Sequence, residues 1–258
     1  MNITKKNYKI YAEPWPHLVV ENFLNSQEAV KFKNEILNFK NFDDKVMVNR
    51  NRVNKGTDNF ENLVQKTKYI KRFYQLMNDE KFYKNVRNLF KKIKLRWVPN
   101  DQYHTFSKNF FGEQKFSFKE KFIKLLSYFG FIKTSMNLDM DFSVSSKGYY
   151  RAAHRDRDTR VINFLLYLNN IPANSGGALE IHEPNFNKNF QDEYPRFPKK
   201  NQVKFVKKIK PKSGRLVVFL STPNSYHAAE KITKKLNRVF VYGSYSLNKK
   251  VNWKKSVK

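Results

Sequence analysis

The chain has 258 residues, a formal net charge of +29 and no cysteine. Without cysteine it has no disulfides, zinc–thiolate sites, iron–sulfur clusters or cysteine nucleophiles. Hydrophobic residues make up 40% of the chain and aromatic residues 16%, enough for a folded core. The N-terminus has no apolar signal run, and no stretch approaches the roughly 20 apolar residues of a membrane span, so we expect a soluble, cytoplasmic protein.

The first third of the chain is expected to hold a short strand, Leu18–Val20, followed by helices. Asn25 and Glu28 have the spacing of a capping box, which predicts the start of a helix. Residues 43–58 are polar and show no regular pattern. The expected helices, from apolar residues at helical spacing, are 25–38, 60–77, 82–93 and 117–130.

Beyond about residue 133 the period changes, and apolar residues alternate with polar ones as in half-buried strands. Turn residues separate these segments and no helices are interleaved, which predicts an antiparallel sandwich or barrel. The fold class is therefore mainly β with a helical N-terminal part (α+β). Residues 184–200 are expected to form a long loop, a lid over one end of the barrel. The expected strands are 136–144, 161–168, 178–182, 202–209, 215–220 and 238–246.

The tripeptide His154-Arg155-Asp156 is the strongest chemical signal in the chain. Residues two apart on an extended strand point to the same side, so His154 and Asp156 can face one point. His227 would complete a two-histidine, one-carboxylate face, which suits ferrous iron in oxygen-using enzymes. Asp158 competes with Asp156 but does not share the strand face with His154. His182 competes with His227 and is expected at the barrel rim.

A charged residue in an apolar strand gives a second signal. Arg238 is followed by Val239, Phe240 and Val241, and a buried guanidinium needs an anion to offset its desolvation. Arginine also suits bidentate binding of a carboxylate. In the strand 161–168 one face holds Asn163, Leu165 and Tyr167, and an inward tyrosine hydroxyl needs a partner. A ligand carboxylate would serve both Tyr167 and Arg238.

These features occur in an order that resembles the prolyl 4-hydroxylase-like iron(II)/2-oxoglutarate oxygenases. The resemblance covers about residues 136–246. It implies a double-stranded β-helix (jelly-roll) domain at 134–248, buttressed by an N-terminal strand and helices at 1–133 and followed by a basic, solvated tail at 249–258. The motifs that carry it are His154-x-Asp156, Arg160, Tyr167-Leu168-Asn169, Gly176-Gly177-x-Leu179, Pro211-Lys212-Ser213-Gly214-Arg215-Leu216-Val217-Val218-Phe219, His227 and Arg238.

The resemblance implies a dioxygenase that hydroxylates a C–H bond, with a prolyl or other amino-acid residue of a protein as the leading substrate. His154, Asp156 and His227 would bind Fe(II). The co-substrate 2-oxoglutarate would chelate the iron, with its far carboxylate at Arg238 and Tyr167. Dioxygen would be the oxidant, and L-ascorbate would keep the iron reduced.

The chain departs from the family pattern in two places. Arg151 stands where several relatives carry an aromatic residue, and Phe240 where relatives often carry a serine. Arg160 would line the substrate entrance or form a surface salt bridge, and Tyr150 is a second candidate for substrate contact or a rim aromatic.

The positive charge leaves another function open. A nucleic-acid-acting oxygenase or a plain nucleic-acid binder is one alternative. The lysines, however, are spread along the whole chain, and Lys, Asn, Ile, Phe and Tyr are abundant together, as in proteins of AT-rich genomes. A non-catalytic jelly-roll module that binds a metal or another ligand is the third hypothesis.

Overall fold

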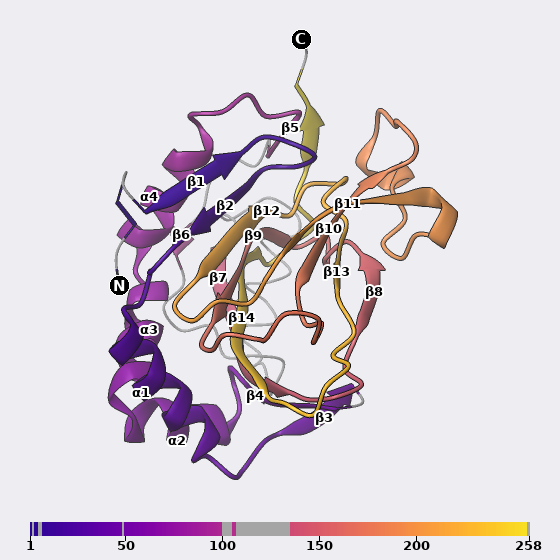
Figure 1. The fold of residues 1–258 in the computed structure, drawn as a ribbon. Coiled ribbons are helices and arrows are strands. Elements are labelled where there is room, and N and C mark those ends of the chain that lie inside the picture. The colour runs from indigo at the N-terminus through magenta and orange to yellow at the C-terminus, as the bar shows by residue number, and fades with distance from the viewer. Residues whose placement is uncertain (2, 5–6, 48, 100–104, 107–134, 257–258) are drawn as a thin grey trace.

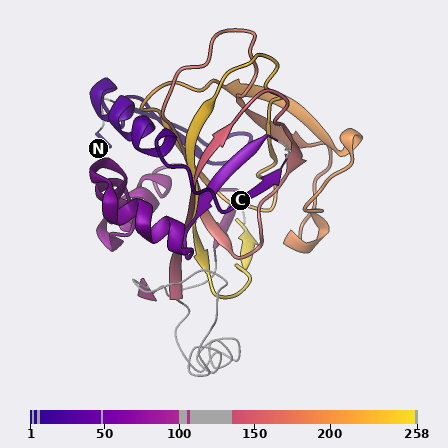
Figure 2. The same ribbon diagram turned by 90° about the horizontal axis from the view of Figure 1, so that it is seen from below.

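The computed structural model describes residues 1, 3–4, 7–47, 49–99, 105–106 and 135–256. The predicted helix at 117–130 and His104 lie outside these residues. Two large antiparallel sheets face each other, and the helices cover the outer side of the larger sheet (Figures 1 and 2). In Figure 2 the segment at about residues 185–209, in orange, lies on the opposite side of the molecule from the helices.

Eight consecutive strands form the barrel. In the larger sheet four of them follow the order β12-β9-β14-β7, and in the smaller sheet the other four follow the order β11-β10-β13-β8. Successive strands thus alternate between the two sheets, except for β10 and β11, which pair with each other in the smaller sheet. This is the double-stranded β-helix topology, and the α+β prediction is confirmed. The strands are β7 (Ser135–Ser145), β8 (Arg151–His154), β9 (Arg160–Tyr167), β10 (Leu179–Pro184), β11 (Val203–Ile209), β12 (Leu216–Leu220), β13 (His227–Ala229) and β14 (Arg238–Leu247).

All six predicted strands are present, with ends that shift by a few residues. The sequence did not predict β8 and β13, because strands of 4 and 3 residues are too short to show an alternation. His227 is the first residue of β13. His154 is the last residue of β8, and Asp156 lies just beyond the end of that strand.

The N-terminal segment extends both edges of the larger sheet. On one side β1 (Tyr8–Tyr11) and β2 (His17–Val20) add to β12. On the other side β4 (Arg50–Asn54) adds to β7, with β3 (Asp44–Met47) outside it. The short β6 (Thr105–Phe106) runs parallel to β7. The unpatterned stretch 43–58 thus contains a β-hairpin that the sequence did not predict.

Within the described residues, four helices pack on the outer face of the larger sheet. They are α1 (Ser26–Leu37), α2 (Asp58–Lys66), α3 (Lys68–Met77) and α4 (Glu80–Phe90). The capping box is confirmed, since Asn25 Oδ1 accepts from the Glu28 backbone N–H at 2.9 Å and Glu28 Oε2 accepts from the Asn25 N–H at 3.3 Å.

The prediction of one helix over 60–77 is wrong. The helix breaks at Thr67, which has the extended torsions φ −124° and ψ 143°. The carboxylate of Glu35 on α1 accepts from the backbone N–H groups of Lys68, Tyr69 and Ile70 and so supplies the N-terminal cap of α3. A break stabilised by a side chain from another helix leaves no local signal in the sequence.

The two faces of β9 bury different cores. Ile162, Phe164 and Leu166 pack into the core between the larger sheet and the helices. Leu165 and Tyr167 pack into the core between the two sheets, against Phe219 and Phe240 among others. The barrel interior is therefore largely apolar, and a polar group inside it requires an explanation.

The C-terminal end is not the solvated tail that its lysines suggested. β15 (Trp253–Lys255) pairs with β5 (Trp97–Pro99), and Val251 and Trp253 are buried. Burial of these two apolar side chains stabilises the segment against the rest of the protein, although lysines surround them in the sequence. In the part of the chain that the structure describes, no helix has the length and apolar character needed to span a bilayer.

Candidate active site

The side chains of His154, Asp156 and His227 converge at one end of the barrel. His154 and His227 are directly paired across β8 and β13, and their ring centroids lie 4.5 Å apart. One donor atom from each of the three residues lies within 4.8 Å of the others. The three are buried, with relative exposures of 3, 3 and 4% for His154, Asp156 and His227. The structure therefore brings together the three residues that the sequence pattern singled out.

Backbone carbonyls fix the orientation of both imidazoles. His154 Nδ1 lies 2.8 Å from the carbonyl oxygen of Ala152, and His227 Nδ1 lies 3.1 Å from that of Ser225. A carbonyl oxygen only accepts, so each Nδ1 carries the proton and each Nε2 is left with a free lone pair. His227 Nε2 faces Asp156 Oδ2 at 3.4 Å. This arrangement is typical of histidines that bind a metal through Nε2.

Both oxygens of Asp156 are held by other side chains. Oδ1 accepts from Arg160 Nη1 at 3.0 Å, and Oδ2 accepts from the Tyr242 hydroxyl at 2.5 Å. Arg160 Nη1 also donates to the Tyr242 hydroxyl at 3.0 Å. Arg160 thus points inward to Asp156, with a longer ion pair of 3.6 Å to Asp139. Sequence reasoning missed Tyr242, although it lies four residues beyond Arg238, on the same face of β14.

The electrostatics leave the three groups in the forms that bind a cation. Burial alone would raise the pKa of Asp156, but Arg160 and the two histidines hold it well below its usual range. Burial lowers the pKa of His154 to about 3, with His227 and Arg151 acting in the same direction, and it also lowers the pKa of His227. Two neutral imidazoles and an ionised carboxylate fit a divalent ion such as ferrous iron.

The nearby alternatives lie outside this cluster. Asp158 forms an ion pair with Arg155 and is partly exposed. His182 Nε2 lies 3.4 Å from Glu180 Oε2, on the smaller sheet. His17 is fully buried, with its ring stacked on Tyr11.

A second group of polar residues lies in the barrel interior. Arg238 on β14 has 2% relative exposure, and Tyr167 and Asn163 on β9 have 0%. The guanidinium carbon of Arg238 lies 5.3 Å from the centroid of the Tyr167 ring. Within the described residues, Arg238 Nε and Nη1, the Tyr167 hydroxyl, and both amide atoms of Asn163 have no hydrogen-bond partner. Unpartnered buried polar groups are costly, which indicates that a polar ligand binds them.

Phe240 separates two buried arginines. The guanidinium carbons of Arg238 and Arg50 lie 4.3 Å and 5.1 Å from the centroid of its ring. Arg50 is balanced, because its Nη2 lies 2.6 Å from Asp141 Oδ1 and its Nε donates to Ser143 at 3.0 Å. In the described part of the chain Arg238 has no carboxylate partner, so it is the arginine left to bind an anion.

The predicted loop at 184–200 reaches the cluster of His154, Asp156 and His227. The ring of Phe197 stacks on His154 with a centroid distance of 6.4 Å and an interplanar angle of 22°, although Phe197 is 64% exposed. Two short 3₁₀ turns, Gln191–Glu193 and Lys200–Gln202, give the loop structure, and Tyr194 is buried. No periodic pattern in the sequence predicts this contact, because tertiary packing places the loop.

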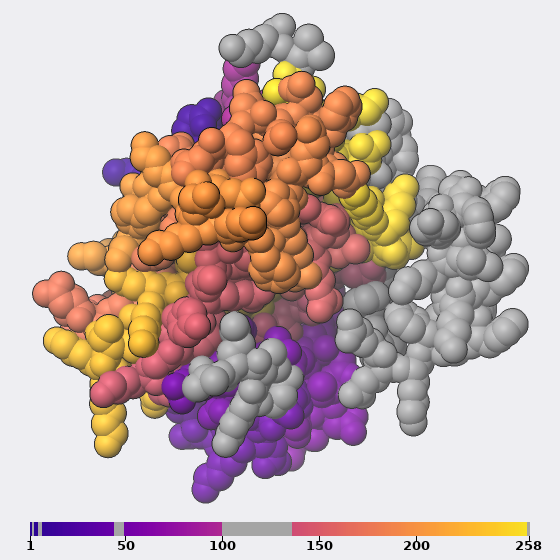
Figure 3. All heavy atoms as spheres, turned by 90° about the vertical axis from the view of Figure 1, so that its right-hand side faces the viewer, coloured from indigo at the N-terminus to yellow at the C-terminus, as the bar shows by residue number. Residues whose placement is uncertain are grey.

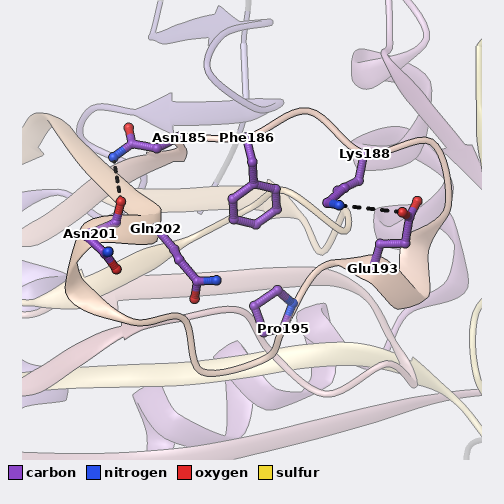
Figure 4. A pocket seen from close by; sticks show the side chains of 7 residues that line it. All are labelled: Asn185, Phe186, Lys188, Glu193, Pro195, Asn201 and Gln202. Carbon is purple, nitrogen blue, oxygen red and sulfur yellow. Dashed lines mark hydrogen bonds and ion pairs between the residues drawn. The ribbon is translucent and has the colours of Figure 1, made fainter.

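A surface pocket of about 330 Å³ lies within the same loop and does not belong to the cluster. Phe186 and Pro195 form its walls, and the ion pair between Lys188 and Glu193 closes one end (Figure 4). Its lining includes none of the three residues at the barrel mouth.

The fold and the donor set define the class of protein. A jelly-roll barrel with two neutral imidazoles and a carboxylate at one end, and a buried unpaired guanidinium in its interior, is the frame of a mononuclear metal oxygenase. Residues 140–245 match the family model described as the 2OG-Fe(II) oxygenase superfamily. This segment is a 2OG-Fe(II) oxygenase domain, which confirms the resemblance at the level of the superfamily and implies Fe(II), 2-oxoglutarate and dioxygen.

Comparison with solved structures gives several distant likenesses. A prolyl-4-hydroxylase from Pseudomonas putida has a TM-score of 0.47 and 14% identity, with 93% of this chain and 92% of that chain covered. A prolyl hydroxylase from Trichoplax adhaerens, solved with a hypoxia inducible factor peptide fragment, has a TM-score of 0.46 and 16% identity, with 89% and 83% covered. HygX from Streptomyces hygroscopicus, solved with nickel and 2-oxoglutarate, has a TM-score of 0.46 and 14% identity, with 89% and 82% covered. A search of curated proteins found no match.

Proposed function

We propose that this chain is an Fe(II)- and 2-oxoglutarate-dependent dioxygenase that hydroxylates a C–H bond in a prolyl or other amino-acid residue of a protein. The observation that carries the proposal is the convergence of His154, Asp156 and His227 within 4.8 Å in a 2OG-Fe(II) oxygenase domain. In the overall reaction, 2-oxoglutarate, dioxygen and R–H give succinate, carbon dioxide and R–OH.

The metal would be held by Nε2 of His154, Nε2 of His227 and the carboxylate of Asp156. When bound, ferrous iron with 2-oxoglutarate supplies the activation of dioxygen that hydroxylation requires. The protein's own part is orientation. Tyr242 and Arg160 hold the carboxylate, and the backbone carbonyls hold the imidazoles with their Nδ1 protons turned away from the metal position.

The co-substrate would be anchored deeper in the barrel. Arg238 offers two unpartnered guanidinium nitrogens and Tyr167 an unpartnered hydroxyl, which suit the far carboxylate of 2-oxoglutarate. Asn163 supplies a donor and an acceptor to the same interior. Apolar side chains such as Leu165 and Phe219 surround these groups and exclude water, which strengthens the charge interaction.

The primary substrate would approach from the side of Phe197 and Tyr150. Tyr150 immediately precedes β8 and is 60% exposed. Large exposed aromatic side chains beside a reactive site favour a macromolecular ligand that covers them on binding. Arg160 is already engaged with Asp156, so we assign it to orientation of that carboxylate, whereas Tyr150 stays a proposed substrate contact.

Succinate formation tests the proposal. The purified protein with Fe(II), ascorbate and 2-oxoglutarate should produce succinate, and peptides that contain proline should stimulate turnover and gain the mass of one oxygen atom. Asp156→Ala should abolish both signals, whereas Asp158→Ala, which changes a neighbouring carboxylate outside the cluster, should retain them. Metal binding without 2-oxoglutarate turnover in the wild type would instead support a non-catalytic module.

A further inference from the structure

Arginines surround the end of the barrel where the three donors converge. Arg151 opens β8, three residues before His154, and Arg157 directly follows Asp156. Arg196 comes from the loop, and its carbonyl oxygen accepts from the backbone N–H of Arg155 at 3.0 Å. Figure 3 shows the surface formed by the loop segment, in orange, against the surface formed by the segment around residue 150, in rose. Residues distant in sequence thus form one basic rim.

Two guanidiniums in this rim lack a carboxylate partner. Arg155 is paired with Asp158, and Arg160 with Asp156. Among the described residues, by contrast, Arg151 has no ion pair, and the Nε of Arg196 is buried without a hydrogen-bond partner. Burial and the like charges of Arg157, Arg151 and Arg160 lower the pKa of Arg196, and Asp156 acts in the opposite direction without offsetting them. The rim is therefore an unbalanced positive site beside the reactive centre.

The aromatic residues of the rim are already associated with these charges. The guanidinium carbon of Arg196 lies 4.9 Å from the centroid of the Phe197 ring, whose other neighbour is His154. The Phe197 ring, although largely exposed, thus already lies beside a guanidinium and an imidazole. A polynucleotide would need a longer basic track with stacking positions along it, whereas a few guanidiniums around one point match a few carboxylates.

We propose that the substrate of this site is an acidic peptide segment, in which aspartate or glutamate residues flank the hydroxylated residue and pair with Arg151 and Arg196. This inference rests on the proposed function and names its substrate class. An extended peptide advances about 3.3 Å per residue, so carboxylates one to three positions from the target would reach a rim this close to the metal ligands.

Binding of defined peptides tests the proposal. The probes are fluorescein-labelled peptides with a central proline flanked by glutamate, glutamine or lysine, and a labelled oligothymidylate. They are titrated into the protein with Mn(II) and 2-oxoglutarate, and anisotropy is read at low and high salt. We expect the glutamate peptide to bind at least about tenfold more tightly than the glutamine peptide, with a preference that shrinks as salt rises.

Variants locate the effect. Arg151→Gln and Arg196→Gln should each weaken binding of the glutamate peptide by about three- to tenfold. Arg72→Gln, on the exposed face of α3, should bind this peptide as the wild type does. The double charge reversal Arg151→Glu/Arg196→Glu should prefer the lysine peptide, and this gain of binding cannot arise from misfolding.

Three results would overturn the inference: equal affinity for the glutamate and glutamine peptides, tighter binding of the oligothymidylate than of the glutamate peptide, or an unchanged preference after charge reversal. The failure of the proposed function is a separate result, because it would appear as a wild-type protein that does not turn over 2-oxoglutarate.

Discussion

The hydroxyl of Tyr242 donates a hydrogen bond to Oδ2 of Asp156 across 2.5 Å. Tyr242 belongs to β14, the same strand that carries Arg238, and the four-residue spacing puts both side chains on its inner face. A single strand thus supports the carboxylate proposed to bind the metal and supplies the guanidinium proposed to bind the co-substrate. The spacing between these two sites is fixed by regular β structure.

Removal of this hydrogen bond should weaken metal binding without loss of the fold. In Tyr242→Phe the ring stays in place but Asp156 loses one of its two orienting partners, so we expect Mn(II) affinity to fall by about 10- to 100-fold. Calorimetric titration with Mn(II) measures the change. The control Tyr74→Phe changes a tyrosine on α3 and should leave the affinity as it is. Equal affinities in both variants would contradict the assigned role of Tyr242.

Replacement of Arg238 should affect co-substrate binding and stability in opposite directions. Arg238→Met removes the proposed anchor, and we expect the KM for 2-oxoglutarate to rise by about 100-fold or more, with Mn(II) affinity retained. The same change removes a buried charge that has no carboxylate partner among the described residues, so the melting temperature without 2-oxoglutarate should rise. An unchanged KM would show that the anchor lies elsewhere.

Stability should fall as the pH is lowered, in part through His17. Burial lowers the pKa of His17 from 6.5 to about 4, with Lys207 acting in the same direction. Between these values the unfolded chain binds a proton that the folded chain does not, so the free energy of unfolding decreases as pH falls across this window. The contribution of His17 is on the order of 3 kcal/mol. Urea unfolding at several pH values should show a smaller pH dependence in His17→Phe, which keeps a ring to stack on Tyr11.

The turn before β10 should tolerate no side chain at Gly176. Its φ is +78°, and a Cβ atom there would lie 1.8 Å from the carbonyl oxygen of Lys231. We expect Gly176→Ala to lower the free energy of unfolding by more than about 2 kcal/mol. Gly177 has a similar φ of +81°, but its nearest contact would be the side chain of Arg238 at 3.3 Å. Gly177→Ala should therefore cost less, and equal losses in urea unfolding would show that torsion alone decides the cost.

The sequence predicted those parts of the fold that have a local cause. Alternating residues revealed β7, apolar runs between turns revealed β9 and β14, and a short-range capping box revealed α1. The break at Thr67 depends on Glu35 from another helix. The strand β15 forms because Trp253 lies opposite Pro99 of β5, which is distant in sequence. Features that depend on such remote contacts leave no periodic trace.

The same distinction applies to the candidate site. Local patterns pointed to His154 and Asp156, which are two residues apart, and to Arg238 in an apolar strand. His227 was chosen from the five histidines of the chain by its place in the order of motifs. Phe197 gave no such signal, since a loop places it beside His154. Tyr242 could have been found, because its position relative to Arg238 follows from strand periodicity.

The attachment of β2 to β12 on one side and of β4 to β7 on the other has a consequence for how the molecule comes apart. The N-terminal segment pairs with both edges of the barrel's larger sheet. It therefore cannot unfold separately without loss of the backbone hydrogen bonds at both edges. Heating should produce a single cooperative transition. A fragment that starts at residue 134 should leave β12 and β7 as bare edges, which are templates for aggregation.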